Sequence, residues 1–150
     1  MATIRRVLVL GAGTMGNGIA HVFAQHGFDV DLVDVRPEAL ERARATIAAN
    51  FDRQIRKGTV TEEVKQRALE RIRTGTDLEV AREADLVVEA ATENKALKFD
   101  LFARLDALAP AHAILASNTS SISITEMAAR TRRPDRVVGM HFMNPVPVMA

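Results

Sequence analysis

Short apolar runs rich in β-branched residues alternate along this chain with longer segments in which apolar residues recur at helical spacing. The run 7–10 is apolar at every position, as in a strand covered on both faces of a parallel sheet. The same pattern predicts strands at 7–10, 29–35, 85–90, 113–116 and 137–142, and helices at 15–25, 37–56, 61–71 and 94–108, with a short helix after Ser123. Alternating strands and helices predict an α/β fold with a doubly wound, mostly parallel sheet and helices on both of its faces.

Composition limits the class of protein. The 150 residues suit one domain, 1–150, and 47% of them are apolar against 26% charged, as in ordinary globular proteins. Twenty basic residues balance nineteen acidic ones, so we expect no nucleic-acid or membrane partner. No run approaches the roughly 18 apolar residues of a membrane span, no cysteine is present, and no His–carboxylate spacing indicates a metal. We expect a cytoplasmic protein, in which the basic cluster 130–133 is a solvated helix end.

The chemistry begins at the first turn, where a G-x-G-x-x-G pattern lies between the first strand and the first helix. Its residues are Gly11, Ala12, Gly13, Thr14, Met15 and Gly16. In a Rossmann-type fold the first glycine allows a tight turn, the second lets the backbone approach a pyrophosphate, and the third permits close packing of helix and strand. The anion rests on the N-terminus of the helix, where free N–H groups and the helix dipole favour negative charge. A glycine-rich turn alone is weak evidence, but here its context matches on both sides.

Asp34 lies eighteen residues after Gly16, at the end of the second predicted strand. A carboxylate there can accept hydrogen bonds from the ribose hydroxyls of an adenosine. A 2′-phosphate would bring about two further negative charges beside it, which Arg36 could offset only in part. The sequence therefore favours NAD over NADP as the cofactor.

Two further groups are expected at the carboxyl ends of strands, where open parallel sheets bind ligands. The run 117–121 is rich in serine, although a loop or a helix cap would have the same composition. His141 ends the last predicted strand, and a histidine is suited to carrying a hydroxyl proton while a hydride leaves the same carbon. A histidine between apolar neighbours is also compatible with a core position. We interpret His21, His26 and His112 as structural or exposed.

Four motifs in order resemble the L-3-hydroxyacyl-CoA dehydrogenases, and the bacterial 3-hydroxybutyryl-CoA dehydrogenases most. They are the G-A-G-T-M-G-N-G-I-A turn, V-V-E-A-A-T-E-N at 87–94, A-S-N-T-S-S at 116–121 and H-F-M-N-P-V-P at 141–147. The resemblance extends over essentially the whole chain. It implies an NAD-dependent enzyme that interconverts (S)-3-hydroxyacyl-CoA and 3-oxoacyl-CoA, with a short acyl chain.

The resemblance also assigns roles to individual residues. His141 matches the catalytic histidine that takes the proton of the C3 hydroxyl, and Ser120 matches the serine that binds the substrate oxygen near the nicotinamide. Further NAD contacts are implied at Glu93, Lys98 and Asn144. Coenzyme A contacts are implied at Asn50 and Lys57, although an exposed lysine without a ligand would look the same in the sequence.

The family pattern continues past Ala150. In the family a glutamate twelve residues after the histidine orients it, which here would be position 153, and a second, helical domain supplies the dimer interface and much of the acyl pocket. We therefore expect this chain to be part of a longer, homodimeric dehydrogenase. By itself the 150-residue chain is expected to bind NAD but to be weakly active or inactive.

Two classes of function fit these observations. One is the cofactor half of an oxidoreductase acting on acyl-CoA. The other is a non-catalytic NAD-binding module with a sensing or assembly role. The presence of both Ser120 and His141 favours the oxidoreductase, because a protein that only binds NAD needs neither side chain at the nicotinamide end.

Overall fold

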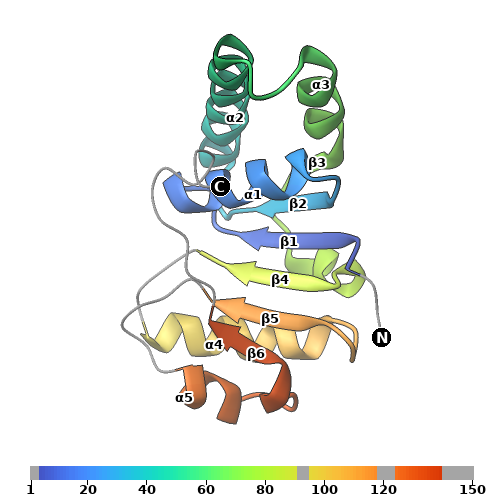
Figure 1. Cartoon of the computed structure of the whole chain (residues 1–150). Helices are drawn as coiled ribbons and strands as arrows, with labels where there is room; N and C mark the ends of the chain where they lie inside the picture. Colours follow the sequence, from blue (N-terminus) through green and yellow to red (C-terminus); the bar gives the residue numbers. More distant parts are fainter. Residues whose placement is uncertain (1–3, 91–94, 118–123, 140–150) are drawn as a thin grey trace.

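The computed structural model describes residues 4–90, 95–117 and 124–139. Within these ranges strands alternate with helices, as the sequence pattern predicts (Figure 1). The strands are β1 (Arg6–Leu10), β2 (Asp29–Val33), β3 (Ile72–Gly75), β4 (Leu86–Glu89), β5 (Ile114–Ser117) and β6 (Val137–Gly139). The α-helices are α1 (Thr14–Gln25), α2 (Pro37–Lys57), α3 (Glu62–Arg71), α4 (Lys95–Leu108) and α5 (Ile124–Ala129). Two 3-10 helices, η1 (Leu78–Glu83) and η2 (Pro134–Arg136), complete the described elements.

The strands form one parallel sheet in the order β3-β2-β1-β4-β5-β6. The order reverses at β1, which pairs with β2 on one side and with β4 on the other. Such a reversal opens a crevice beyond the carboxyl ends of the two central strands, and it is the place where doubly wound sheets bind ligands. The predicted Rossmann-type architecture is therefore confirmed.

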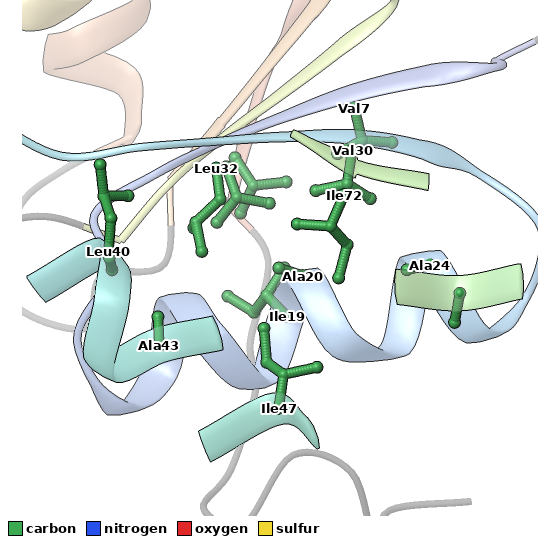
Figure 2. Packing of buried hydrophobic residues seen from close by; sticks show 14 of the residues in the cluster. Val7, Ile19, Ala20, Ala24, Val30, Leu32, Leu40, Ala43, Ile47 and Ile72 are labelled. Atoms are coloured by element: carbon green, nitrogen blue, oxygen red, sulfur yellow. The ribbon is translucent and has the colours of Figure 1, made fainter. Parts of the chain in front are cut away.

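The sheet separates two apolar layers, and β1 contributes to both. Val7 and Val9 face the layer formed with α1, α2 and α3, whereas Leu8 and Leu10 face the layer formed with η1, α4 and α5. Figure 2 shows the first layer, where Ile19 of α1 and Ile47 of α2 approach the sheet. Because both faces of β1 are covered, every position from 7 to 10 must be apolar, which explains the uninterrupted run in the sequence.

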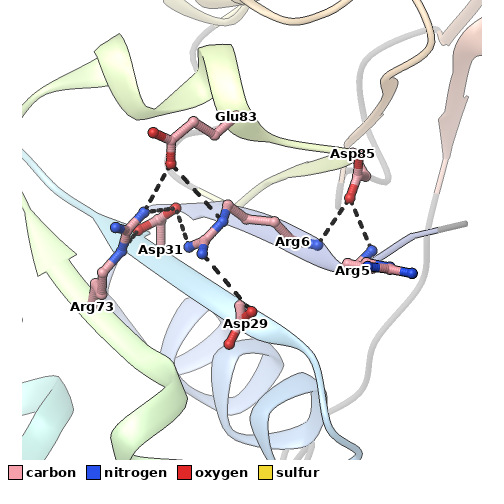
Figure 3. Close-up of polar contacts among 7 residues, drawn as sticks. All are labelled: Arg5, Arg6, Asp29, Asp31, Arg73, Glu83 and Asp85. Carbon is pink, nitrogen blue, oxygen red and sulfur yellow. Dashed lines mark hydrogen bonds and ion pairs between the residues drawn. The ribbon is translucent and has the colours of Figure 1, made fainter.

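The edge strand β3 and the short helix η1 were not expected from the sequence. β3 has one buried residue, Ile72, so it lacks the apolar run that marks the central strands. A polar contact helps to hold it instead: Arg73 donates to Asp31 of β2 with N–O distances of 2.8 and 3.1 Å (Figure 3). Asp31 is almost fully buried, and it also accepts a hydrogen bond from Arg6 Nη1 at 3.3 Å. Asp31 is therefore a buried, paired carboxylate that ties β1 and β3 to β2, whereas Asp29 of the same strand is exposed.

The basic cluster 130–133 is exposed at Arg130 and Arg132, as expected for a solvated helix end, and Arg133 is the exception. The cluster follows α5, but the Arg133 side chain is only 10% exposed and reaches the end of a different helix, α4. Its guanidinium donates to Asp106 Oδ1 at 2.7 Å and to four backbone carbonyl oxygens, those of Asp106, Ala109, Pro110 and Ala113. A cation therefore satisfies carbonyl groups at the negative end of the α4 dipole, through a tertiary contact that local sequence does not show.

His21, which the sequence left as structural or exposed, is a fully buried core histidine. Its ring stacks on Phe51 of α2 with centroids 3.8 Å apart, and Nε2 lies 2.8 Å from Gln54 Oε1. Burial lowers the pKa of His21 below its usual 6.5, and the hydrogen bonds with Gln54 and Gln25 offset this only in part. The folded chain therefore holds a neutral imidazole between α1 and α2.

Acidification below pH 6.5 is expected to destabilise the chain through His21. The unfolded state takes up a proton at His21 near the usual pKa of 6.5, whereas the folded state takes it up only at lower pH. The free energy of unfolding therefore does not depend on His21 above pH 6.5, and it falls as the pH drops below 6.5. The loss approaches about 1.4 kcal/mol per pH unit. Urea unfolding between pH 5 and 7.5 measures it, and His21→Phe should remove the slope. An equal slope in both proteins would contradict the assignment.

Candidate functional site

The glycine-rich turn lies between β1 and α1, as expected. Gly11 adopts φ +107°, a conformation that side-chain-bearing residues rarely take, and its N–H donates to Val33 O at 2.7 Å. Gly13 is the N-cap of α1, and no side chain caps this end of the helix. The first turn of α1 also contains no acidic residue. The positive end of the helix dipole is therefore left for an anion, as a pyrophosphate site requires.

Gly16 permits the close approach of α1 to the turn. A Cβ atom at this position would overlap the carbonyl oxygen of Gly11 and lie 2.7 Å from its carbonyl carbon, both of which are backbone atoms. At Gly13, by contrast, a Cβ atom would have no heavy atom within 4 Å, so the space in front of the helix is open. The first and third glycines are thus required by the protein's own backbone, and the second leaves room for a ligand.

Asp34 follows β2 directly and is joined to the glycine-rich turn. Its Oδ2 accepts the N–H of Ala12 at 2.9 Å, and its Oδ1 accepts the N–H of Arg36 at 2.9 Å. Burial alone would raise the pKa of the Asp34 carboxyl, but these two hydrogen bonds and the Arg36 guanidinium outweigh it and lower the pKa. Asp34 is therefore a carboxylate at neutral pH, beside the end of α1 that attracts a pyrophosphate.

A shallow pocket of about 340 Å³ opens at the same edge of the sheet. Its lining includes Leu10 and Val33, the last residues of β1 and β2, and Val35, which is 83% exposed. The remaining lining residues are Thr76, Asp77, Leu78, Leu101 and Arg104. Sequence reasoning missed these side chains, because they come from the β3–η1 connection and from α4 and meet only in the folded sheet. Two of its lining residues, Val33 and Val35, flank Asp34 in the chain.

Lys98 lies in the first turn of α4, and its side chain is fully buried. Its Nζ is 2.9 Å from Glu89 Oε1 at the end of β4, and that carboxylate is fully buried as well. Ser117, the last residue of β5, donates its hydroxyl to the same oxygen at 2.9 Å. Sequence reasoning named Lys98 but gave no role to Glu89, although an acid that closes an apolar strand was a signal for it.

The two residues matched to coenzyme A contacts lie on α2. Asn50 is half-buried, and Lys57 is exposed at the last position of the helix. They are seven positions apart, about two helical turns, so they share one face of α2. Figure 1 shows α2 and α3 extending from the edge of the sheet at which β3 lies. Glu93, Ser120, His141 and Asn144 lie outside the described residues.

The other histidines have structural contacts. His112 Nε2 lies 2.7 Å from Asp85 Oδ1 at the amino edge of the sheet, and His26 Nδ1 lies 2.8 Å from Val22 O. In the part of the chain that the structure describes, no three acidic or histidine side chains gather as metal ligands would. No described helix is long and apolar enough to cross a membrane.

Comparison with known proteins identifies the family. The family model described as "3-hydroxyacyl-CoA dehydrogenase, NAD binding domain" matches residues 6–150. The chain belongs to this family. It is thus an NAD-binding domain, in agreement with the geometry of the turn and of Asp34.

Several relatives carry related names. A 3-hydroxybutyryl-CoA dehydrogenase of Bradyrhizobium diazoefficiens is 52% identical over 99% of this chain, which covers 50% of that protein. A 3-hydroxyadipyl-CoA dehydrogenase of Escherichia coli is 46% identical over 99% of this chain and 31% of its own length. The crystal structure of (S)-3-hydroxybutyryl-CoA dehydrogenase from Ralstonia eutropha superposes with a TM-score of 0.94 at 49% identity, covering 99% of this chain and 52% of that one. The chain spans about half the length of the curated 3-hydroxybutyryl-CoA dehydrogenases that it matches.

Proposed function

We propose that this chain is the cofactor half of an NAD-dependent dehydrogenase that interconverts (S)-3-hydroxyacyl-CoA and 3-oxoacyl-CoA. The observation that carries the proposal is the bond between Ala12 N–H and the Asp34 carboxylate, which joins an adenosine-binding acid to an uncapped helix N-terminus. Relatives named for 3-hydroxybutyryl-CoA support a short acyl chain as substrate. We further propose that the protein that carries this domain is cytoplasmic and forms a homodimer.

The roles of the residues follow the direction of the dinucleotide across the sheet. Asp34 binds the ribose of the adenosine, and the N–H groups of the turn 11–16 bind the pyrophosphate. Glu93, Lys98 and Asn144 are proposed to bind the nicotinamide half, and Asn50 and Lys57 to bind coenzyme A. Bound NAD supplies the hydride acceptor. The His141 imidazole takes the proton of the 3-hydroxyl, and the Ser120 hydroxyl hydrogen-bonds the same substrate oxygen.

Acyl-CoA-dependent oxidation of NADH tests the activity directly. The protein that carries this domain should oxidise NADH when acetoacetyl-CoA is added and should not do so without it. NAD binding without this reaction would instead favour a binding module with a sensing or assembly role. The presence of His141 and Ser120 in the sequence argues for the enzyme, because the adenosine and pyrophosphate contacts alone would serve both functions.

Asp34→Ala is expected to weaken NAD binding and to narrow the preference for NAD over NADP. Loss of a bidentate, charge-assisted hydrogen bond costs about 2–4 kcal/mol, and removing the carboxylate also removes its repulsion of a 2′-phosphate. Isothermal titration with both cofactors measures the effect. Asp29→Ala is the matched control, because it removes the same charge from the opposite, exposed end of β2. Equal affinities of the parent chain for NAD and NADP would contradict the assignment.

A further inference from the structure

Glu89 and Lys98 form a buried ion pair at the carboxyl edge of the sheet. Their oxygen–nitrogen distance is 2.9 Å, and neither side chain has exposed surface. Of the ion pairs between described residues, this is the one in which both partners are fully buried; the others retain exposure on at least one side. Ser117 donates to the same carboxylate oxygen, so the pair connects the ends of β4 and β5 with the start of α4.

The strand order places this pair on the nicotinamide side of the proposed cofactor site. Asp34 follows β2, and the pyrophosphate-binding turn follows β1. In the order β2-β1-β4-β5, a dinucleotide that extends from β2 across β1 continues beyond the ends of β4 and β5. Glu89 and Ser117 are the last residues of these two strands and pair with each other in register.

Stability alone is a weak reason for such a pair. Burying two charges costs desolvation energy that their mutual attraction often fails to recover, so apolar residues of similar size stabilise a core at least as well. What the pair does provide is a buried ammonium whose charge is balanced locally. That balance matters for a nicotinamide, because the oxidised ring carries a positive charge and the reduced ring does not.

We infer that Glu89 is a specificity-determining and positioning residue, which neutralises and orients Lys98 so that the site accepts the cationic ring of NAD⁺ as well as the neutral ring of NADH. Glu89 acts through Lys98 and Ser117 and not by contact with the ring. The inference rests on the proposed function, because it requires the nicotinamide half to lie at this edge.

Glu89→Gln tests the inference by affinity, without any need for turnover. The substitution keeps the shape of the side chain but leaves the Lys98 charge uncompensated. We expect the ratio of the Kd of NAD⁺ to the Kd of NADH to rise about tenfold or more, the size that one uncompensated charge produces at short range in an effective dielectric near 20. The Kd of ADP-ribose, which lacks the nicotinamide, should stay within about twofold.

Two further variants separate this effect from a change in folding. Glu89→Gln combined with Lys98→Met removes both charges, so the double variant should fold and the NAD⁺-to-NADH ratio should return towards that of the parent protein. Asp106→Asn is the matched control, because it removes a buried carboxylate that pairs with Arg133 near the opposite end of α4. It should lower thermal stability and leave the ratio unchanged.

The outcomes distinguish the inference from the proposed function. If the parent protein binds none of the three ligands, the proposed function fails first. If the parent binds all three, an unchanged ratio in folded Glu89→Gln overturns the inference, as does an equal loss of NAD⁺, NADH and ADP-ribose. If Glu89→Gln does not fold, Lys98→Met decides, because it leaves the opposite charge at the site: a ratio below that of the parent supports charge balance, and an unchanged ratio overturns it.

Discussion

Gly16→Ala is expected to prevent stable folding, whereas Gly13→Ala, three residues earlier, should fold but bind NAD more weakly. A Cβ atom at position 16 would overlap the Gly11 carbonyl. The clash cannot be relieved by turning a side chain, because the Gly11 atoms belong to the backbone and the Cβ atom is attached directly to it. A substitution of this kind costs more than about 4 kcal/mol, a large part of the roughly 5–15 kcal/mol by which domains are stable. At Gly13, where φ is −74°, an alanine fits both the backbone and the space around it.

The two alanine variants therefore separate the roles of the second and third glycines. Gly13→Ala should unfold close to the parent temperature while its methyl group fills the space through which the backbone approaches a pyrophosphate, raising the Kd of NAD about tenfold or more. Thermal unfolding and NAD titration of both variants provide the measurement. If Gly16→Ala unfolds at the same temperature as the parent chain, the close packing of α1 on the turn is not as described.

Most of the fold could be predicted from the sequence because each central element carries its own local signal. The run 7–10 is apolar throughout since both faces of β1 are covered, and Pro37 marks the first turn of α2. β3 carries no such signal. It is an edge strand with one buried residue, and its place depends on the contact of Arg73 with Asp31, which lies 42 positions earlier.

The candidate site likewise has a part that the sequence predicts and a part that it does not. The glycine-rich turn and Asp34 were predictable, because a turn that binds pyrophosphate has a fixed local pattern and a fixed distance to the acid. The burial of Lys98 against Glu89 was not, since three separate elements create it. Arg133 shows the same limit: its sequence neighbours indicate a solvated helix end, and only the fold brings it to the carbonyls of α4.

His141→Gln is expected to lower turnover by about 10²–10⁴-fold in the protein that carries this domain, with NAD affinity nearly unchanged. Glutamine can still hydrogen-bond a substrate oxygen, but it cannot take up a proton near neutral pH, so the oxidation of the alcohol loses its general base. Steady-state oxidation of NADH with acetoacetyl-CoA measures the rate, and isothermal titration measures NAD binding. His112→Gln is the matched control, because His112 pairs with Asp85 at the amino edge of the sheet, away from the proposed site.

The comparison of the two histidine variants decides between catalysis and structure. A catalytic His141 requires a fall in kcat that His112→Gln does not show, in a variant that keeps the unfolding temperature and the Kd for NAD of the parent protein. A structural His141 requires the reverse, because loss of a core histidine lowers the folded fraction while each folded molecule keeps its rate. Dividing the rate by the folded fraction therefore separates the two roles: a specific rate equal to that of the parent would remove His141 from the proposed mechanism and leave the proton without an acceptor there.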